Sequence, residues 1–293
     1  MNKELARELI GAGVHFGHAA SRWNPKMEPY IFGKRGMIHI INVKETLKGL
    51  LIAKKLLATV VSSGKDVVFV GTKRQAQKAV RQAAEKCGMH YVSERWLGGT
   101  LTNFRTIRTR LARLEELEEM ERSGHLETES KKQGARLKRE LNKIRTNLDG
   151  IRRMNRLPGV VVVVDAKKEY IALREARKLG VATVAIIDTD SDPDTVDVAV
   201  PANDDSIKAI EILLDELATS AAEGKTMTKP EDTFAAARPV RTRSRRRVLA
   251  TAEGQTVVDE DTDDEAHADS NTGGDDEAAN AASQPAQAES TAQ

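Results

Sequence analysis

The chain has 293 residues, of which 40% are hydrophobic and 31% are charged, so it can build one sizeable core without being folded throughout. The formal net charge of +2 conceals an asymmetry, because residues 248–293 contain no Lys or Arg and twelve Asp or Glu. Residues 1–247 therefore carry all 46 basic side chains against 32 acidic ones (44 less 12), a net charge of +14. A body this basic favours a polyanionic partner such as nucleic acid.

Cysteine content and apolar runs exclude several other classes of protein. A single cysteine, Cys87, excludes an internal disulfide and favours a reducing cytosol. The first residues carry acidic side chains and no apolar core, unlike a signal or transit peptide. The most apolar run, residues 160–164, is much shorter than the roughly 20 residues that cross a bilayer. We expect a soluble, cytoplasmic protein with no membrane partner.

Short β-rich runs alternate with helical stretches through the first 224 residues. The expected elements are strands at 37–41, 67–70, 90–92, 160–164, 183–187 and 196–200, and helices at 43–61, 74–86, 168–179 and 204–222. Several of these strands are continuously apolar, as expected when both faces of a sheet are covered. The alternation predicts an α/β fold in which helices flank a parallel, doubly wound sheet.

Residues 104–155 interrupt this alternation with helical sequence only. Apolar residues recur at steps of four and three, a heptad seam, at Leu137, Leu141, Ile144, Leu148 and Ile151. The same steps occur between Phe104 and Leu114, and a turn signal follows at residues 123–125. We predict an antiparallel coiled-coil hairpin over 104–155, inserted into a discontinuous α/β RNA-binding core formed by residues 1–103 and 156–224.

The remaining residues, 225–293, are predicted to be a disordered tail. Six Arg lie within residues 238–247, and the acidic stretch that follows has no aromatic residue to repay the entropy of folding. Two roles stay open for the acidic stretch: masking the Arg cluster and the basic body before RNA binds, or solubility alone.

The first segment of chemical interest spans residues 14–36. It combines aromatic rings, basic side chains and turn-forming Pro and Gly without a regular period. Aromatic faces stack on unpaired bases while Arg and Lys meet phosphates, so the segment is typical of a protein that binds looped RNA. The alternative is a loop whose aromatic rings fill the core.

Two groups of residues could hold a metal ion. His15 and His18 have the His-x-x-His spacing of half a zinc site, but no further ligand pair is evident, so we interpret them as structural histidines. Acidic residues also follow two predicted strands, where they could bind Mg²⁺ or serve as turn and cap residues, and we favour the second role. They are Asp188, Asp190, Asp192, Asp194, Asp204 and Asp205.

Gly-containing loops at residues 71–75 and 95–103 lead toward helices and could bind anions, which raises the alternative of a nucleotide-binding enzyme. No Gly-x-Gly-x-x-Gly, P-loop or nucleophile elbow is present in the sequence. We therefore expect no enzyme, no cofactor and no small-molecule substrate. Lys73 and Arg74 oppose the dipole at a helix N-terminus, so we expect an RNA phosphate to compensate their charge.

Several long blocks resemble one family. They are AGVHFGH (12–18), RWNPKM (22–27), PYIFG (29–33), GMIHII (36–41), FVGTK (69–73), RWLGGTLTNF (95–104), EARKLG (175–180), DTDSDP (188–193) and PANDD (201–205). The family is that of bacterial small-subunit ribosomal protein two, the universal uS2 family, and the resemblance covers about residues 5–224. The tail after Gly224 departs from the short family core.

The resemblance implies a flavodoxin-like sheet with a protruding helical hairpin, seated between head and body of the small subunit. It also implies contacts with small-subunit ribosomal RNA and neighbouring ribosomal proteins, and a part in recruiting small-subunit protein one. A receptor or scaffold role, reported for animal relatives, is the alternative, and the bacterial-style helical insert argues against it. Carried over by position, the RNA-facing candidates are Arg22, Trp23, Lys26, Lys34, Arg35, Lys73, Arg74, Arg95, Trp96, Asn103 and Arg105.

Overall fold

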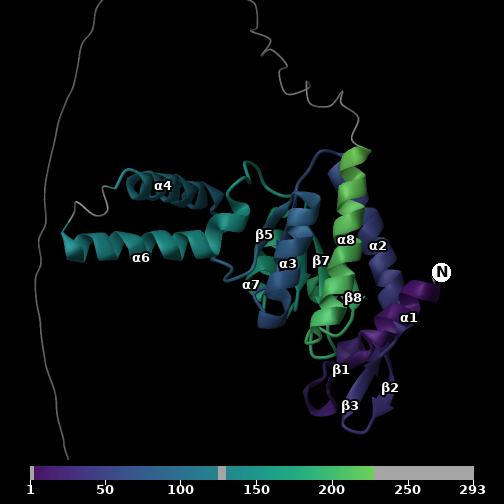
Figure 1. The fold of residues 1–293 in the computed structure, drawn as a ribbon. Coiled ribbons are helices and arrows are strands. Elements are labelled where there is room, and N and C mark those ends of the chain that lie inside the picture. Colours follow the sequence, from purple (N-terminus) through teal and green to yellow (C-terminus); the bar gives the residue numbers. More distant parts are fainter. Residues whose placement is uncertain (1–2, 125–129, 228–293) are drawn as a thin grey trace, which may run out of the picture. The chain divides into compact units, whose positions relative to one another are not determined.

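A computed structural model describes residues 3–124 and 130–227, which belong to one compact unit (Figure 1). The predicted disorder of the tail lies outside these residues, except at its start. There the last helix, α8 (Ile207–Thr226), continues past residue 225, so the predicted boundary is two residues too early. Within 3–124 and 130–227, no helix is both long and apolar enough to span a membrane.

A five-stranded parallel sheet forms the centre of the unit. Its strands are β4 (Val67–Val70), β5 (His90–Val92), β6 (Val160–Val164), β7 (Ala182–Ile187) and β8 (Val198–Pro201). The order is β5-β4-β6-β7-β8, and every neighbouring pair is parallel. In chain order this is 2-1-3-4-5, the order of flavodoxin-like folds, with its topological switch between β4 and β6. The predicted α/β fold with a parallel sheet is confirmed.

Helices cover both faces of the sheet, which explains the continuously apolar strands. In β6, Val160, Val162 and Val164 belong to one core cluster, whereas Val161 and Val163 belong to the other. The first cluster lies under α2 (Val43–Ser62), α3 (Arg74–Cys87) and α8, and the second lies under α7 (Tyr170–Leu179). Local signals set the helix ends: Asn42 and Ser206 cap α2 and α8, and left-handed Gly88 and Gly180 end α3 and α7.

The N-terminal region folds into a second, smaller sheet. After α1 (Lys3–Gly11), it contains β1 (Phe16–Ala19), the short 3₁₀ helices η1 (Ala20–Arg22) and η2 (Pro25–Tyr30), β2 (Ile31–Arg35) and β3 (Ile38–Ile41). The antiparallel order is β1-β3-β2. Sequence analysis predicted only the third of these strands and treated residues 14–36 as irregular. That was wrong, because short strands with irregular register and little burial leave no alternating pattern.

The inserted segment is helical, with α4 (Phe104–Arg122), α6 (Lys131–Leu148) and the short η3 (Asp149–Ile151). Residues of the expected seam are buried on both helices: Ile107, Leu111, Leu114, Leu141, Ile144 and Leu148. Ion pairs also join the helices, with Arg113 Nε 3.7 Å from Glu140 and Arg145 Nη2 3.2 Å from Glu118. The helices are therefore packed together, while the antiparallel coiled coil stays a prediction.

Candidate nucleic-acid interface

The candidate interface lies at the carboxyl edge of the sheet. Because the five strands are parallel, the loops that follow them meet at this edge. The N-terminal segment packs against the same loops: His18 N donates to Thr189 Oγ1 at 3.0 Å, and Asn24 N donates to Thr189 O at 2.8 Å. A Cβ on Gly17 would lie 2.6 Å from Thr189 Cγ2, so only glycine permits this approach. Segments far apart in sequence thus form one surface.

Nine of the eleven predicted RNA-facing residues are exposed: Arg22, Trp23, Lys26, Lys34, Arg35, Arg74, Arg95, Asn103 and Arg105. The Trp23 ring rests 5.2 Å from the ring of His39, and its side chain is 36% exposed. Lys26 Nζ forms ion pairs with Asp192 (2.9 Å) and Asp194 (2.7 Å), and such exposed pairs exchange readily for other anions. These placements are compatible with contacts to RNA, which stay a prediction.

Lys73, one of the predicted RNA-facing residues, is held by carboxylates of the protein itself. Its side chain is 14% exposed, and its Nζ lies 2.8 Å from Asp204 Oδ1 and 2.6 Å from Asp205 Oδ1. Burial lowers the pKa of Lys73, but its hydrogen bonds to the two carboxylates outweigh burial and raise it. The positive charge at the start of α3 is compensated inside the protein, so RNA is not needed to explain it.

Trp96, another of the predicted RNA-facing residues, has a buried ring at 6% exposure. Its indole Nε1 donates to Glu175 Oε1 at 3.2 Å. The same carboxylate accepts from the backbone N–H groups of Gly99 (2.7 Å), Leu101 (2.9 Å) and Thr102 (3.1 Å). Burial raises the pKa of Glu175, but these hydrogen bonds outweigh it and the net pKa is lowered. Glu175 therefore fixes the loop that carries Arg95 and Asn103.

Glu169 does the same for the loop after β4. It is 3% exposed, and it accepts hydrogen bonds from Thr72 N at 3.0 Å and from Thr72 Oγ1. Burial raises the pKa of Glu169. Sequence analysis missed both Glu169 and Glu175. The available signal was their spacing in line with Ala172, Leu173 and Ala176, since Glu169 directly precedes α7 and Glu175 lies on its inner face.

The switch point between β4 and β6 argues against nucleotide binding. Folds of this order bind ligands in the crevice at that point, where phosphates need N–H groups and positive charge. Here Asp165 and Glu169 follow β6, and Asp204 adds a third carboxylate by contacting Lys73. Asp165 has φ +69° and uses its Oδ1 to accept from the N–H groups of Lys167 and Lys168. The N–H groups of Thr72, Lys167 and Lys168 are thus already used by carboxylates and are not free for a nucleotide phosphate.

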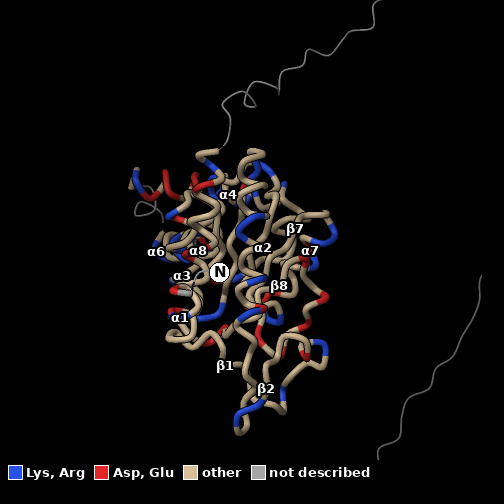
Figure 2. The backbone as a smooth tube through the Cα atoms, turned by 90° about the vertical axis from the view of Figure 1, so that its right-hand side faces the viewer, with Lys and Arg blue, Asp and Glu red and all other residues tan. Residues whose placement is uncertain are grey.

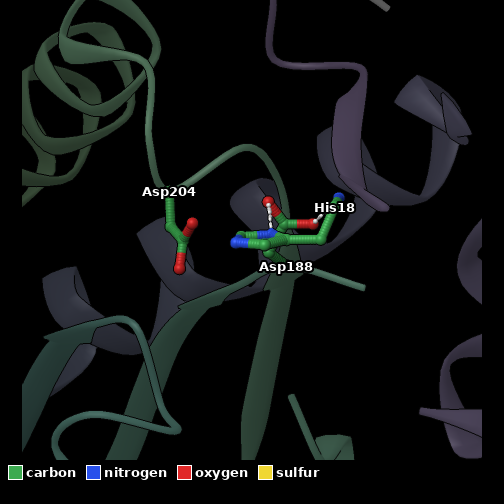
Figure 3. A group of neighbouring side chains, drawn as sticks. All are labelled: His18, Asp188 and Asp204. Carbon is green, nitrogen blue, oxygen red and sulfur yellow. Dashed lines mark hydrogen bonds and ion pairs between the residues drawn. The ribbon is translucent and has the colours of Figure 1, made fainter. Parts of the chain in front are cut away.

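One mixed cluster has the residue types of a cation site: His18, Asp188 and Asp204 (Figure 3). One ligand atom from each lies within 4.8 Å of the others, and the two carboxylates are each 1% exposed. His18 Nδ1 lies 2.9 Å from Asp188 Oδ2, and this contact raises the pKa of His18 to about 9. Burial raises the pKa of Asp204 to about 7, although Lys73 acts against the shift.

This cluster is already balanced by protein groups. Asp188 also accepts from the N–H of Thr189, and Lys73 neutralises Asp204. Three ligands are one fewer than a structural zinc site uses. His15 is not among them, since its ring packs 4.1 Å from that of Phe16. The arrangement is that of an ion-pair network, in line with the structural role favoured for these residues, and we assign no metal to it.

Known proteins similar to this chain identify its family. The family model described as ribosomal protein S2 matches residues 9–224. The chain belongs to the ribosomal protein S2 family. It is 52% identical over 231 residues to small ribosomal subunit protein uS2 of Rhodopirellula baltica, covering 79% of this chain and 89% of that protein. It is 49% identical over 221 residues to protein uS2 of Koribacter versatilis, covering 75% and 73%.

A further relative is small ribosomal subunit protein uS2c of Rhodomonas salina, 52% identical over 229 residues that cover 77% of this chain and 94% of that protein. Members of the S2 family are structural proteins of the ribosome, so this chain has a structural ribosomal role and is not an enzyme. The family match ends at residue 224, near the end of α8.

Proposed function

We propose that this S2 family member is a structural constituent of the small ribosomal subunit in the cytoplasm, where it binds small-subunit ribosomal RNA. It sits between head and body, contacts neighbouring ribosomal proteins and supports the docking of small-subunit protein one, and thereby translation. The names of the relatives in Rhodopirellula baltica and Koribacter versatilis support the place in the small subunit.

The observation that carries RNA binding is the separation of charge at the carboxyl edge of the sheet. Carboxylates such as Glu169, Glu175 and Asp204 are buried and hold loops or Lys73. The same loops present Arg74 and Arg95 to solvent. Because these three acids face the interior while Arg74 and Arg95 face solvent, the loops present a surface suited to phosphate.

Two further features support contacts within the subunit. The packed helices α4 and α6 correspond to the hairpin that the resemblance implies, and α6 begins with Lys131 and Lys132, both exposed. On β2 and the turn after it, Phe32 and Met37 are 79% and 73% exposed. Large apolar side chains exposed on one hairpin favour a protein partner, consistent with neighbouring ribosomal proteins.

Two measurements test this function. Tagged protein should co-sediment with small subunits through a sucrose gradient. Purified protein should bind small-subunit ribosomal RNA with a log–log salt slope of about −0.7 to −0.9 per phosphate contact. Replacing Arg74 and Arg95 with Ala should flatten that slope, whereas Lys44→Ala with Lys55→Ala, on the exposed side of α2, should not. Affinity independent of salt, or absence from the small-subunit fractions, would contradict the proposal.

A further inference from the structure

The outward face of α7 and the turn before it form a second basic surface, outside the predicted RNA-facing set. Between residues 166 and 180 every cation is exposed: Lys167, Lys168, Arg174, Arg177 and Lys178. The two carboxylates in this stretch, Glu169 and Glu175, are buried and engaged with loops on the inner side. The charged side chains on the exposed side of this segment are therefore all positive. In Figure 2, α7 lies among several Lys and Arg positions.

Helix stability does not account for this charge. Cations in the last turn, such as Arg177 and Lys178, complement the helix dipole. Lys167 and Lys168, however, directly precede the helix, where positive charge is unfavourable. Lys167 is offset by Asp190, 3.0 Å away, while Lys168 Nζ donates to the backbone oxygen of Thr72 and its charge also acts on the neighbouring Glu169. The helix itself gains nothing from cations at this end, and both side chains remain exposed to solvent.

The centre of the face is organised for a flat or charged ligand. The guanidinium of Arg174 lies 5.9 Å from the centre of the Tyr170 ring, a cation–π contact, and Tyr170 is 53% exposed. Arg174 and Lys178 are four residues apart, so they lie on one side of the helix and about 6 Å apart along its axis. This separation is comparable with that of successive phosphates along one RNA strand.

We propose that this face of α7, centred on Tyr170, Arg174 and Lys178, binds the sugar–phosphate backbone of small-subunit ribosomal RNA. The inference rests on the proposed function and names a surface for it. Continuity favours RNA over an acidic protein: Lys168 contacts Thr72, which lies two residues from Arg74 on the cationic carboxyl edge. One nucleic-acid backbone can therefore run from the loops onto α7.

The test compares two matched double variants of the full chain. Arg174→Ala with Lys178→Ala removes two exposed cations from α7, and Lys44→Ala with Lys55→Ala removes two from α2, on the opposite side of the sheet. Binding to small-subunit ribosomal RNA is measured at a series of salt concentrations from about 50 to 200 mM, and circular dichroism verifies folding. Arg174→Lys is a third variant, because it keeps the charge but loses the planar stack on Tyr170.

We expect the α7 variant to flatten the log–log slope by about 1.4 to 1.8, two contacts at about 0.7 to 0.9 each, and the α2 variant to leave it unchanged. Arg174→Lys should retain most of the slope and bind more weakly. Equal effects of both double variants would overturn the assignment, since charge alone would then suffice. Normal RNA binding but poor co-sedimentation of the α7 variant would also overturn it, in favour of a protein partner. If the unaltered chain itself binds no RNA, the proposed function fails instead.

Discussion

Replacing Glu175 with Ala removes the acceptor that holds the loop of Trp96. Five donors then lose their partner: Trp96 Nε1, the Thr102 hydroxyl and the N–H groups of Gly99, Leu101 and Thr102. A buried donor left unsatisfied costs about 1–3 kcal/mol, and such costs do not add fully once the loop relaxes. We expect a loss of about 3 kcal/mol in the free energy of unfolding, measured as a lower midpoint in urea at constant slope. RNA binding should weaken as well, because the loop also carries Arg95.

The pH dependence of the same variant provides a separate check. The folded protein lowers the pKa of Glu175 below its usual 4.5, so its contribution is present above that value and is lost as pH falls through the folded pKa. The difference between variant and unaltered chain should therefore be full at pH 7 and shrink below pH 4.5. The control is Glu85→Ala, at an exposed position on α3, which should change stability by less than about 0.5 kcal/mol. A Glu175→Ala protein as stable as the control at pH 7 would refute the reasoning.

Two other substitutions test the interior. Lys73→Ala leaves the buried Asp204 without its partner and should lower the free energy of unfolding by about 3 kcal/mol. Arg74→Ala, at an exposed position, should not lower it, so equal urea midpoints for the two variants would contradict the assignment of Lys73 to the ion-pair network. Gly49→Ala places a Cβ 2.4 Å from the backbone oxygen of Ala199, so α2 must move away from β8. The midpoint of thermal unfolding should therefore fall by several degrees. An unchanged midpoint would show that α2 can move away from β8 without loss of stability.

Local patterns were sufficient for much of the fold. The apolar runs of β4 and β6 and the periodic helices α3 and α8 are visible within short windows of sequence, and the structure confirms them. The small N-terminal sheet was missed because its short, half-exposed strands have no clear period.

The surroundings of Trp96 and Lys73 could not be predicted from the sequence, because the partner of each side chain is remote. Trp96 looks like a base-stacking residue until Glu175, 79 positions later, is seen to accept its N–H. Lys73 looks like a phosphate ligand until Asp204, 131 positions later, is seen beside it. Charge and residue type indicate what a side chain can bind, but the fold determines which partner lies within contact distance.

The placement of β6 beside β4 also has a consequence for synthesis. Val67 of β4 pairs with Val160 of β6, so 93 residues must be added after Val67 before this pair can form. At about 5–20 residues per second, this delay is roughly 5 to 20 s. During that time the apolar β4 and the faces of α2 and α3 that later contact the sheet lack their main partner. A nascent chain stopped before residue 160 should therefore be protease-sensitive and prone to bind chaperones, and protection should arise abruptly once β6 to β8 have followed.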